Sequence, residues 1–426
     1  MTIAADTSRP ASLPATGRIA VIGAGAVGLS CALHLRRHGL DVDIYDLRPP
    51  GEGASRGNAG ILATSEVLPI GRPAILARVP AMLFFPTGPL AIRARYLPRL
   101  APWLLRMLWA SRAGEVARIS GHLSGLLALA LPAWKELIRA SPAQALLHTD
   151  GWLKAFCDGQ AFERAAADAA ILRELGVRVE ALDGGAVADI EPALAPLAGG
   201  LLFPDCGNLV TPLAASQALA AEARKAGVTF YRREVLQLGS APASFLKTAE
   251  GGEATYDRIV VAAGAWSGRL LRSMGVSLPL DTERGYHLML PTPERILRRP
   301  VTLPAPGYTL TQMPEGVRLT TGVEFAGLDA PPDFRRAMRM AAHAMKALPG
   351  LSPQPFEKWL GFRPSMPDSM PVIGPLRHHP RIILALGHGH LGVTLGPVTG
   401  EIVAALVTGR PGPVDAAPLS PSRFGA

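Results

Sequence analysis

The sequence predicts a mixed α/β protein in which one parallel-sheet domain, made of three separate chain segments, is interleaved with a second domain built on an antiparallel sheet. Strand–helix units occur near the N-terminus and return at 213–262 and 381–407. Between them lie two stretches that break this alternation, and the later one, 278–325, alternates like antiparallel strands. A chain that leaves and re-enters one domain in this way is expected to bind its ligand where the two domains meet.

The first unit carries the clearest motif. A strand at Arg18–Ile22 is followed by Gly23, Gly25 and Gly28, and then by a helical pattern and a second strand that ends at Asp46. The first two glycines permit a tight turn and a close approach of a pyrophosphate, the third permits close helix packing, and the carboxylate can bind ribose hydroxyls. The segment therefore predicts a dinucleotide site, and an ordinary glycine turn with a solvated strand-end acid is the structural alternative.

The remaining elements follow from the periodicity of apolar residues. Residues 67–112 are rich in proline, arginine and large apolar side chains and do not continue the alternation. The other expected elements are helices at 115–140, 160–176, Leu213–Ala226 and 330–348, strands at Val228–Leu238, Arg258–Ala262 and Arg381–Leu386, and a last helix that ends near Val407.

Composition narrows the possible partners. Lys and Arg number 43 against 34 Asp and Glu, a net charge of +9, but the excess is almost all arginine and forms no lysine-rich tail. We therefore expect no nucleic-acid partner. Three cysteines without metal-ligand spacing argue against a disulfide framework and a zinc site. The longest uncharged apolar run, Ile119–Trp134, is shorter than the ~20 residues that span a bilayer, so no transmembrane helix and no secretion signal are expected.

Five motifs in consistent order make the chain similar to a known family. They are GAGAVG with Asp46, ASRGNAG at 54–60, AAGAWS at 262–267, GFRP at 361–364 with the PD and PVIG segments that follow it, and GHGHLG at 387–392. Together they resemble the FAD-dependent D-amino-acid oxidase superfamily, and within it the bacterial D-amino-acid dehydrogenases, with glycine oxidase and sarcosine oxidase as more distant relatives. The resemblance runs from about 18 to 410 and is weakest in 67–200.

The resemblance implies a Rossmann-like FAD domain of the glutathione-reductase type beside the antiparallel substrate domain. It implies FAD segments at 18–66, 201–275 and 361–412, substrate segments at 67–200 and 276–360, a flexible tail at 1–17 and a C-terminal tail at 413–426. The FAD contacts it implies are Gly23, Ala24, Gly25, Val27, Gly28, Asp46, Arg48, Ser55, Asn58, Ala59, Gly60, Val235, Ala263, Gly264, Gly389, His390, Leu391, Gly392 and Thr394.

The start of the last helix and the absence of an attachment residue indicate how FAD would be held. Glycines at the start of the last helix leave backbone N–H groups free to stabilise the negative charge that a reduced flavin carries, so the backbone of 389–394 matters more than its imidazoles. Neither His nor Cys occurs in 54–60, and no cysteine lies at a family attachment point, so we expect FAD to be bound non-covalently.

The resemblance also assigns the substrate site. Arg363 matches the arginine that holds a substrate carboxylate, a bidentate role that lysine cannot reproduce. Tyr308 and His287 match positions near the substrate, and for both a structural role is an open alternative. The implied reaction is hydride transfer from Cα of a D-amino acid to flavin N5, which gives an imine and then a 2-oxo acid. The side chain of the substrate is not determined, and D-proline and hydroxy-D-proline are among the candidates. The alternative reaction is oxidation of glycine, sarcosine or other secondary amino acids by oxygen.

The electron acceptor and the location of the protein are the last expectations. The resemblance to dehydrogenases favours a quinone or another carrier, and a cytoplasmic protein with a peripheral contact at the inner face of the cell membrane through 92–112. Arg93, Arg95, Arg99 and Arg106 would then meet anionic lipid while Trp103, Leu104, Leu105 and Trp109 lie at the interface. A cover over the active site is the alternative for this segment. Two other classes are disfavoured. The chain lacks the second glycine fingerprint of a pyridine-nucleotide reductase, and it lacks the interleaved basic and aromatic patches of a nucleic-acid-binding flavoprotein.

Overall fold

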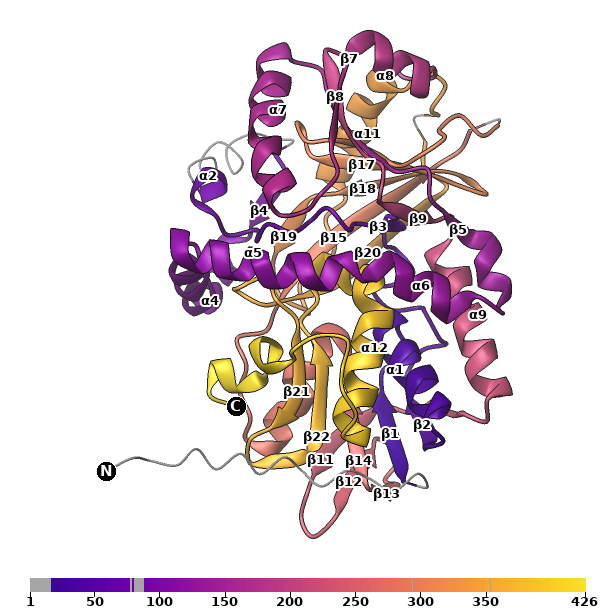
Figure 1. The fold of residues 1–426 in the computed structure, drawn as a ribbon, viewed down its shortest axis with the longest axis vertical. Coiled ribbons are helices and arrows are strands. Elements are labelled where there is room, and N and C mark those ends of the chain that lie inside the picture. Colours follow the sequence, from indigo (N-terminus) through magenta and orange to yellow (C-terminus); the bar gives the residue numbers. More distant parts are fainter. Residues whose placement is uncertain (1–16, 77–78, 80–87, 293, 353) are drawn as a thin grey trace.

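The computed structural model describes residues 17–76, 79, 88–292, 294–352 and 354–426. Residues 1–16 of the predicted tail at 1–17 lie outside these residues. The described chain forms two large sheets in two interleaved domains, as the sequence predicts, with the parallel sheet in the lower half of Figure 1 and the antiparallel strands in the upper half.

The six-stranded sheet has the order β10-β2-β1-β14-β22-β21. All neighbours pair in parallel except β21 and β22, so the carboxyl ends of the four central strands meet at one edge, where a ligand is expected. Its strands are β1 (Arg18–Ile22), β2 (Asp41–Tyr45), β10 (Thr229–Tyr231), β14 (Arg258–Val261), β21 (Val372–Leu376) and β22 (His379–Leu386).

Helices cover this sheet and share one core with it. Apolar side chains of α1, α9 and α12 are buried together with those of α5 and α6, and the Trp134 indole N–H donates to the carbonyl of Val393 at 2.8 Å. Figure 1 shows α1 and α12 side by side, with α5 and α6 as one long rod across the molecule. These helices are α1 (Ala26–Arg37), α5 (Ala113–Ala128), α6 (Ala130–Ile138), α9 (Pro212–Lys225) and α12 (Gly392–Thr408).

The ten-stranded sheet has the order β4-β19-β15-β18-β17-β16-β6-β8-β7, and β20 pairs with β15 off this path. Long strand β15 is therefore the centre of this domain, bordered by β18 and β19 on one side and β20 on the other. The strands are β4 (Leu90–Ile92), β6 (Trp152–Phe156), β7 (Glu180–Asp183), β8 (Gly199–Phe203), β15 (Asp281–Leu290), β16 (Val301–Leu303), β17 (Tyr308–Met313), β18 (Gly316–Thr321), β19 (Val323–Phe325) and β20 (Glu357–Ser365).

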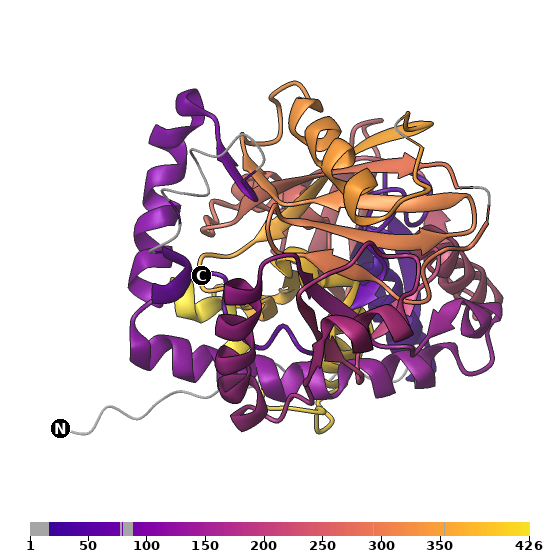
Figure 2. The same cartoon turned by 90° about the horizontal axis from the view of Figure 1, so that it is seen from above.

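Helix α11 (Arg335–Ala347) packs on one face of that sheet through its alanines and Met340. Figure 2 shows the helices of 97–138 along two sides of the molecule, around the orange strands. The smaller helices are α2 (Pro73–Leu76), α4 (Leu97–Ala110), α7 (Gly159–Glu174), α8 (Gly184–Ile190) and α10 (Ser267–Leu271), and the 3₁₀ turns are 94–96, 142–146, 264–266, 272–274, 389–391, 417–419 and 421–424. Two three-stranded sheets contain β11 (Val235–Gly239), β12 (Ser244–Thr248) and β13 (Glu253–Tyr256), and β3 (Ile61–Leu62), β5 (Leu147–His148) and β9 (Gly207–Leu209).

Several details differ from the prediction. The single strand expected at Val228–Leu238 is two strands, β10 and β11, in different sheets. The predicted domain boundaries at 201 and 361 fall inside β8 and β20, both strands of the ten-stranded sheet. The segment predicted as a C-terminal tail is packed on the protein, because Leu419 is buried and the Arg423 guanidinium donates to Asp368 at 2.8 Å.

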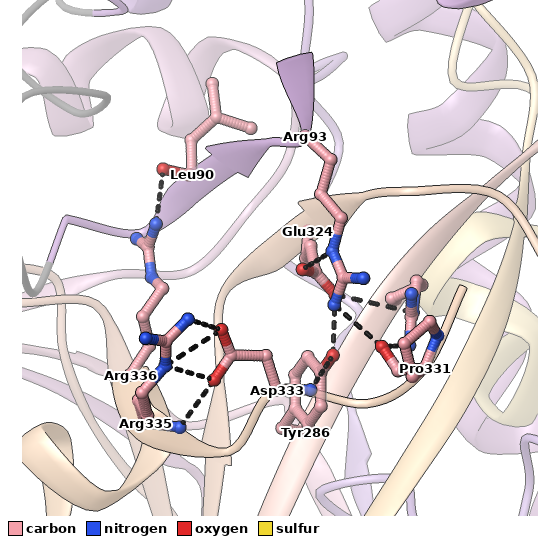
Figure 3. Close-up of polar contacts among 9 residues, drawn as sticks. Leu90, Arg93, Tyr286, Glu324, Pro331, Asp333, Arg335 and Arg336 are labelled. Atoms are coloured by element: carbon pink, nitrogen blue, oxygen red, sulfur yellow. Dashed lines mark hydrogen bonds and ion pairs between the residues drawn. The ribbon is translucent and has the colours of Figure 1, made fainter. Parts of the chain in front are cut away.

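Helix α4 is only partly available to a membrane. Trp103 is buried and donates to the carbonyl of Ser365, and Arg93, just before the helix, pairs with Glu324 at 2.8 Å (Figure 3). Trp103 therefore does not face solvent or lipid, in contrast to the prediction, and the Arg93 charge is already paired within the protein. The exposed side chains of the segment are Arg95, Leu97, Arg99, Leu105, Arg106, Leu108, Trp109 and Arg112.

Two helical segments are long and apolar enough to cross a membrane by length and composition, Ala113–Ile138 and Gly389–Thr408. The first shows that the apolar run around Ile119–Trp134 belongs to a longer helical segment than the sequence argument allowed. This is weak evidence for a membrane span, because core helices of soluble proteins meet the same criteria and most of the second segment is buried inside the protein.

Candidate active site

The glycine turn after β1 is built as the fingerprint requires. Gly23 has φ +113°, and a Cβ on it would lie 2.3 Å from the carbonyl oxygen of Ala262, at the end of the neighbouring strand. A Cβ on Gly28 would lie 1.9 Å from the carbonyl oxygen of Gly23, so only glycine lets α1 start this close to the turn. The Asp46 carboxylate accepts the Ala24 N–H at 2.8 Å, which fixes the end of β2 against the turn.

A cavity of about 870 Å³ lies beside this turn and extends to the ten-stranded sheet. This volume falls within the range of ligand sites. Fourteen of the predicted cofactor contacts line it: Gly23, Gly25, Val27, Asp46, Arg48, Ser55, Asn58, Ala59, Val235, Ala263, Gly264, Gly389, His390 and Gly392.

The other five predicted contacts do not line the cavity, and most have visible structural roles. Gly28 and Ala24 support the turn as described above. A Cβ on Gly60 would lie 2.4 Å from the Leu209 carbonyl oxygen, so this glycine lets two segments pack closely. Leu391 is buried in the core, and the buried Thr394 hydroxyl accepts the Ala63 N–H at 3.1 Å. These residues shape the wall from behind.

The loop at 54–60 is held by side chains from distant parts of the chain. Ser55 Oγ accepts the Ala26 N–H at 3.1 Å, which ties the loop to the first turn of α1. The Arg318 guanidinium donates to the carbonyls of Arg56 and Asn58 at 2.9 and 2.8 Å. A loop restrained at both ends can present a fixed surface to a flat ring.

The last segment of the wall is the turn that leads into α12. Gly389 adopts φ +55°, and His388 behind it is buried, with Nε2 2.9 Å from the hydroxyl of Thr399. Burial lowers the pKa of His388 to about 4, so it is neutral at pH 7. No side chain of the described residues caps the start of α12, so the N–H groups of its first turn and the helix dipole favour negative charge in this part of the cavity.

Arg363 lies in the cavity wall on β20. Its guanidinium donates to the carbonyls of Thr321 and Gly322 at 3.2 and 3.3 Å, and it has no carboxylate partner within ion-pair distance in the described part of the chain. The space it occupies depends on Gly285, since a Cβ there would lie 2.4 Å from Arg363 Nη2. Burial lowers the pKa of Arg363, and the nearby Glu283 opposes this shift.

His287 is not in the cavity wall, which corrects the prediction. Its side chain is fully buried, stacks on Trp359 at 5.0 Å between ring centroids, and has Nδ1 3.3 Å from the Gly57 carbonyl. Burial, together with the charge of Arg318, lowers the pKa of His287 to about 3. It is a neutral core residue that supports Trp359 and the loop at 54–60.

Tyr308 also has a different role from the predicted one. It borders the cavity, but its ring packs in the apolar core with α11 and its hydroxyl lies 3.0 Å from Nδ1 of His343 on that helix. Because strand neighbours face opposite sides, the adjacent Thr309 faces the cavity instead, with its hydroxyl 2.7 Å from that of Thr302. The hydroxyl of Tyr308 is thus engaged away from the site.

Charged residues that the sequence argument missed complete the wall. Lys154 pairs with Glu66 at 2.6 Å, and His390 Nε2 lies 4.0 Å from the same carboxylate. Burial alone would raise the pKa of Glu66, but Lys154 and His390 lower it to about 2. Glu283 on β15 is buried and lines the cavity as well. Of these residues, only Glu283 could have been found from the sequence, because it lies four residues before His287 in the predicted strand and therefore on the same face.

Comparisons with known proteins give the class of the protein. The model of the FAD dependent oxidoreductase (DAO) family matches residues 18–406, so the chain belongs to this family. It is 34% identical over 421 residues to a D-amino-acid oxidase of Bradyrhizobium diazoefficiens, which covers 97% of this chain and all of that protein. It is 30% identical to a D-amino acid dehydrogenase of Methylobacterium nodulans, over 96% of this chain and 99% of that protein.

Solved structures share the fold. Glycine oxidase from Geobacillus kaustophilus superimposes with a TM-score of 0.72 at 24% identity, over 95% of this chain and 98% of that one. L-proline dehydrogenase from P. horikoshii gives 0.71 at 19% identity, over 97% and 98%. The interleaved architecture predicted from the sequence is thereby confirmed.

The residues present fit the FAD that the family uses. The turn is one that only glycine permits at Gly23 and Gly28, Asp46 and Arg48 follow β2, and residues of the restrained loop at 54–60 and of the start of α12 line the same cavity. These features provide, in order, a phosphate turn, groups for a ribose, and two surfaces for a flat ring. The chain is therefore an FAD-dependent oxidoreductase.

Proposed function

We propose that this enzyme oxidises D-amino acids at the α C–N bond to give an imine, which water hydrolyses to a 2-oxo acid. The observation that carries the proposal is Arg363, a guanidinium in the cavity wall that pairs with no carboxylate of the described chain. Such a group binds a substrate carboxylate bidentately. The names of the two curated relatives, a D-amino-acid oxidase and a D-amino acid dehydrogenase, support the same substrate class.

The chain's own residues would mainly bind and orient the substrate. Arg363 holds the carboxylate, and Gly285 keeps the space that its guanidinium needs. The turn of 23–28 with Asp46 and Arg48 would hold the ADP half of FAD, and Asn58, Ala59 and the 389–393 backbone the ring. When bound, FAD supplies an acceptor for two electrons and the α-hydrogen. By fixing Cα next to that acceptor, these residues would accelerate the reaction mainly through proximity and orientation.

The test is anaerobic titration of the FAD-loaded protein with a panel of D- and L-amino acids, glycine and sarcosine, followed by flavin absorbance. We expect D-amino acids, D-proline among them, to bleach the flavin and their L-enantiomers not to. Bleaching by glycine or sarcosine alone would favour the alternative reaction, and no bleaching by any amino acid would refute the proposal.

The electron acceptor is a separate part of the proposal. We propose a quinone or a similar carrier, because a dehydrogenase relative matches almost the full length of the chain and α4 exposes apolar and basic side chains. The rate of oxygen uptake, compared with the rate of reduction of a soluble quinone by the same enzyme and D-amino acid, distinguishes oxygen from a quinone as the acceptor. Oxygen uptake at the full rate of turnover would favour an oxidase.

The exposed face of α4 suggests a peripheral contact with the inner face of the cell membrane. Leu105, Leu108 and Trp109 are each more than half exposed, and Arg99 and Arg106 are exposed on the same helix. Apolar side chains beside arginines suit a surface of anionic lipid. Co-sedimentation with phosphatidylglycerol vesicles should fall strongly in a Leu105→Glu/Trp109→Glu variant, and full recovery of the native protein in the supernatant would refute the contact.

A further inference from the structure

Glu283 has no role in the function proposed so far. It lies on β15 directly opposite Arg363 of β20, so the two side chains share the face of the sheet that borders the cavity. Glu283 is only 3% exposed. A carboxylate in such a position must be compensated, because burying an unpaired charge is costly.

No compensation comes from the protein. Within the described chain the Glu283 carboxylate accepts no hydrogen bond and forms no ion pair, since the Arg363 guanidinium turns to the carbonyls of Thr321 and Gly322. The charged groups whose fields reach it are Arg363, His390 and Asp281. Asp281 is itself engaged by the Tyr96 hydroxyl at 2.9 Å. Glu283 is thus a buried carboxylate aimed into the cavity with an open bonding position.

The spacing between Glu283 and the arginine suits an amino-acid head group. The Arg363 guanidinium lies over Gly285, two residues along β15 from Glu283. At ~3.4 Å per residue, the guanidinium lies roughly 7 Å along the strand from the backbone of Glu283. A carboxylate and an ammonium attached to one carbon fit between them, with one hydrogen bond of about 2.8 Å at each end.

We propose that Glu283 binds the α-ammonium of the substrate and accepts its proton, while Arg363 holds the carboxylate. This inference rests on the proposed oxidation of amino acids. It adds a second specificity group, since the site then recognises the zwitterion and discriminates against carboxylates that lack an amine. It also adds a general base, which turns the ammonium into the free amine that oxidation requires.

The steps balance. One N–H bond of the ammonium breaks, and its proton forms an O–H bond on Glu283 while the electron pair stays on nitrogen. The α C–H bond would then break and the nitrogen lone pair would form the C=N bond of the iminium product, while FAD, when bound, would supply the acceptor for the hydrogen and both electrons of the broken bond. The proton on Glu283 returns to solvent before the next turnover.

The first experiment measures binding without turnover. 2-Aminoisobutyrate is a zwitterion without an α-hydrogen, and isobutyrate is the same carboxylate without the amine. With the FAD-loaded enzyme, we expect Glu283→Gln to weaken 2-aminoisobutyrate at least tenfold, from perturbation of the flavin spectrum or calorimetry, and to leave isobutyrate unchanged or tighter. Equal weakening of both ligands would overturn the proposal, because it would indicate a general change of the site.

The second experiment measures proton transfer. For a D-amino acid that the native enzyme oxidises, Glu283→Gln should slow anaerobic flavin reduction near neutral pH by about 10²-fold. The loss should shrink as the pH rises and solution supplies the free amine. Glu283→Asp should restore part of the rate, and Glu253→Gln, which changes an exposed carboxylate on β13 away from the cavity, should keep the native pH profile.

The outcomes separate the two proposals. If no amino acid bleaches the flavin of the native enzyme, the proposed function is wrong. If D-amino acids bleach it and Glu283→Gln has the native pH profile and native affinity for 2-aminoisobutyrate, only the role of Glu283 is wrong. Should Glu283→Gln fail to retain FAD, the same measurements on Glu283→Ala decide, because that variant also lacks the carboxylate. A native pH profile and native affinity for 2-aminoisobutyrate in Glu283→Ala would contradict the proposal.

Discussion

The two faces of β15 differ in how their charges are compensated. On the face away from the cavity, Arg284 and Tyr286 both meet Glu324, with Arg284 Nε 3.4 Å from its carboxylate and the Tyr286 hydroxyl donating to it. Arg93 binds the same carboxylate, and Figure 3 shows this network continuing to Asp333. On the cavity face, Glu283, the residue before Arg284, has no hydrogen-bond or ion-pair partner among the residues that the structure describes.

This difference distinguishes residues that hold the fold from residues that await a ligand. Both faces bury charge, so burial alone does not identify the site. The network around Glu324 joins the residue after β4 with β15, β19 and the segment before α11, and the Glu324 carboxylate accepts hydrogen bonds from both Arg93 and Tyr286. Across the sheet, the Arg363 and Glu283 charges are left for a molecule that the chain does not contain.

The largest expected effect comes from removing the arginine on the cavity face. Arg363→Ala should raise the KM for a D-amino acid about 10³-fold, because a charge-assisted bidentate contact in a buried site is worth about 4 kcal/mol. Bound FAD, measured from the flavin spectrum, should stay at the native level. Arg335→Ala, which removes an exposed arginine paired with Asp333, is the control. An unchanged KM in Arg363→Ala would contradict the assignment of the substrate site.

Removing the arginine on the opposite face should affect stability instead. Arg284→Met leaves part of the Glu324 charge without its partner, and breaking a buried ion pair costs about 3 kcal/mol. We expect the free energy of unfolding in guanidinium chloride to fall by about that amount. The KM of the folded, FAD-loaded variant should stay native. A raised KM at native stability would mean that the two faces do not divide structure from binding in this way.

How far the sequence predicts the molecule depends on the kind of residue. The glycine turn, Asp46 and the interleaved fold could be predicted because they rest on backbone constraints that a short motif states completely. Arg363 was found through its motif. Tyr308 borders the cavity as predicted, but its hydroxyl contacts His343 of α11, so the structural alternative applies to that group. His287 lies under Trp359 and outside the cavity wall, because a strand motif does not state which face of the sheet a side chain occupies.

Other parts of the site depend on contacts between distant segments. Lys154 and Glu66 meet only after β6 joins the ten-stranded sheet, and Arg318 reaches the loop at 54–60 from 260 residues away. No local pattern contains such pairs. The alternation of side chains along β15 predicts that Glu283 shares a face with His287, because the two are four residues apart. That Arg363 lies opposite Glu283 follows only from the register between β15 and β20, which the sequence does not give.

A smaller change tests how tightly the cavity face positions its arginine. In Gly285→Ala the new Cβ would lie 2.4 Å from Arg363 Nη2, so the guanidinium must move. We expect KM to rise about tenfold to a hundredfold, the cost of a displacement near 1 Å in a positioning group. Gly121→Ala in α5, where an added Cβ meets nothing within 4 Å, is the matched control. A native KM in Gly285→Ala would mean that the arginine has freedom to adjust.

The smallest effect concerns His287, which shares the cavity face of β15 but is covered by Trp359. Burial lowers its pKa to about 3, below the ~6.5 of an unfolded histidine, so between these values the unfolded chain binds a proton that the folded chain does not. The stability it contributes is complete above pH 6.5 and is lost as the pH falls toward 3. His287→Gln should therefore reduce the loss of unfolding free energy between pH 7 and pH 5.5 by about 1 kcal/mol. The pH profile of kcat/KM should not change, because a covered histidine titrates with the fold. A changed kinetic profile with an unchanged stability slope would instead place His287 in the active site.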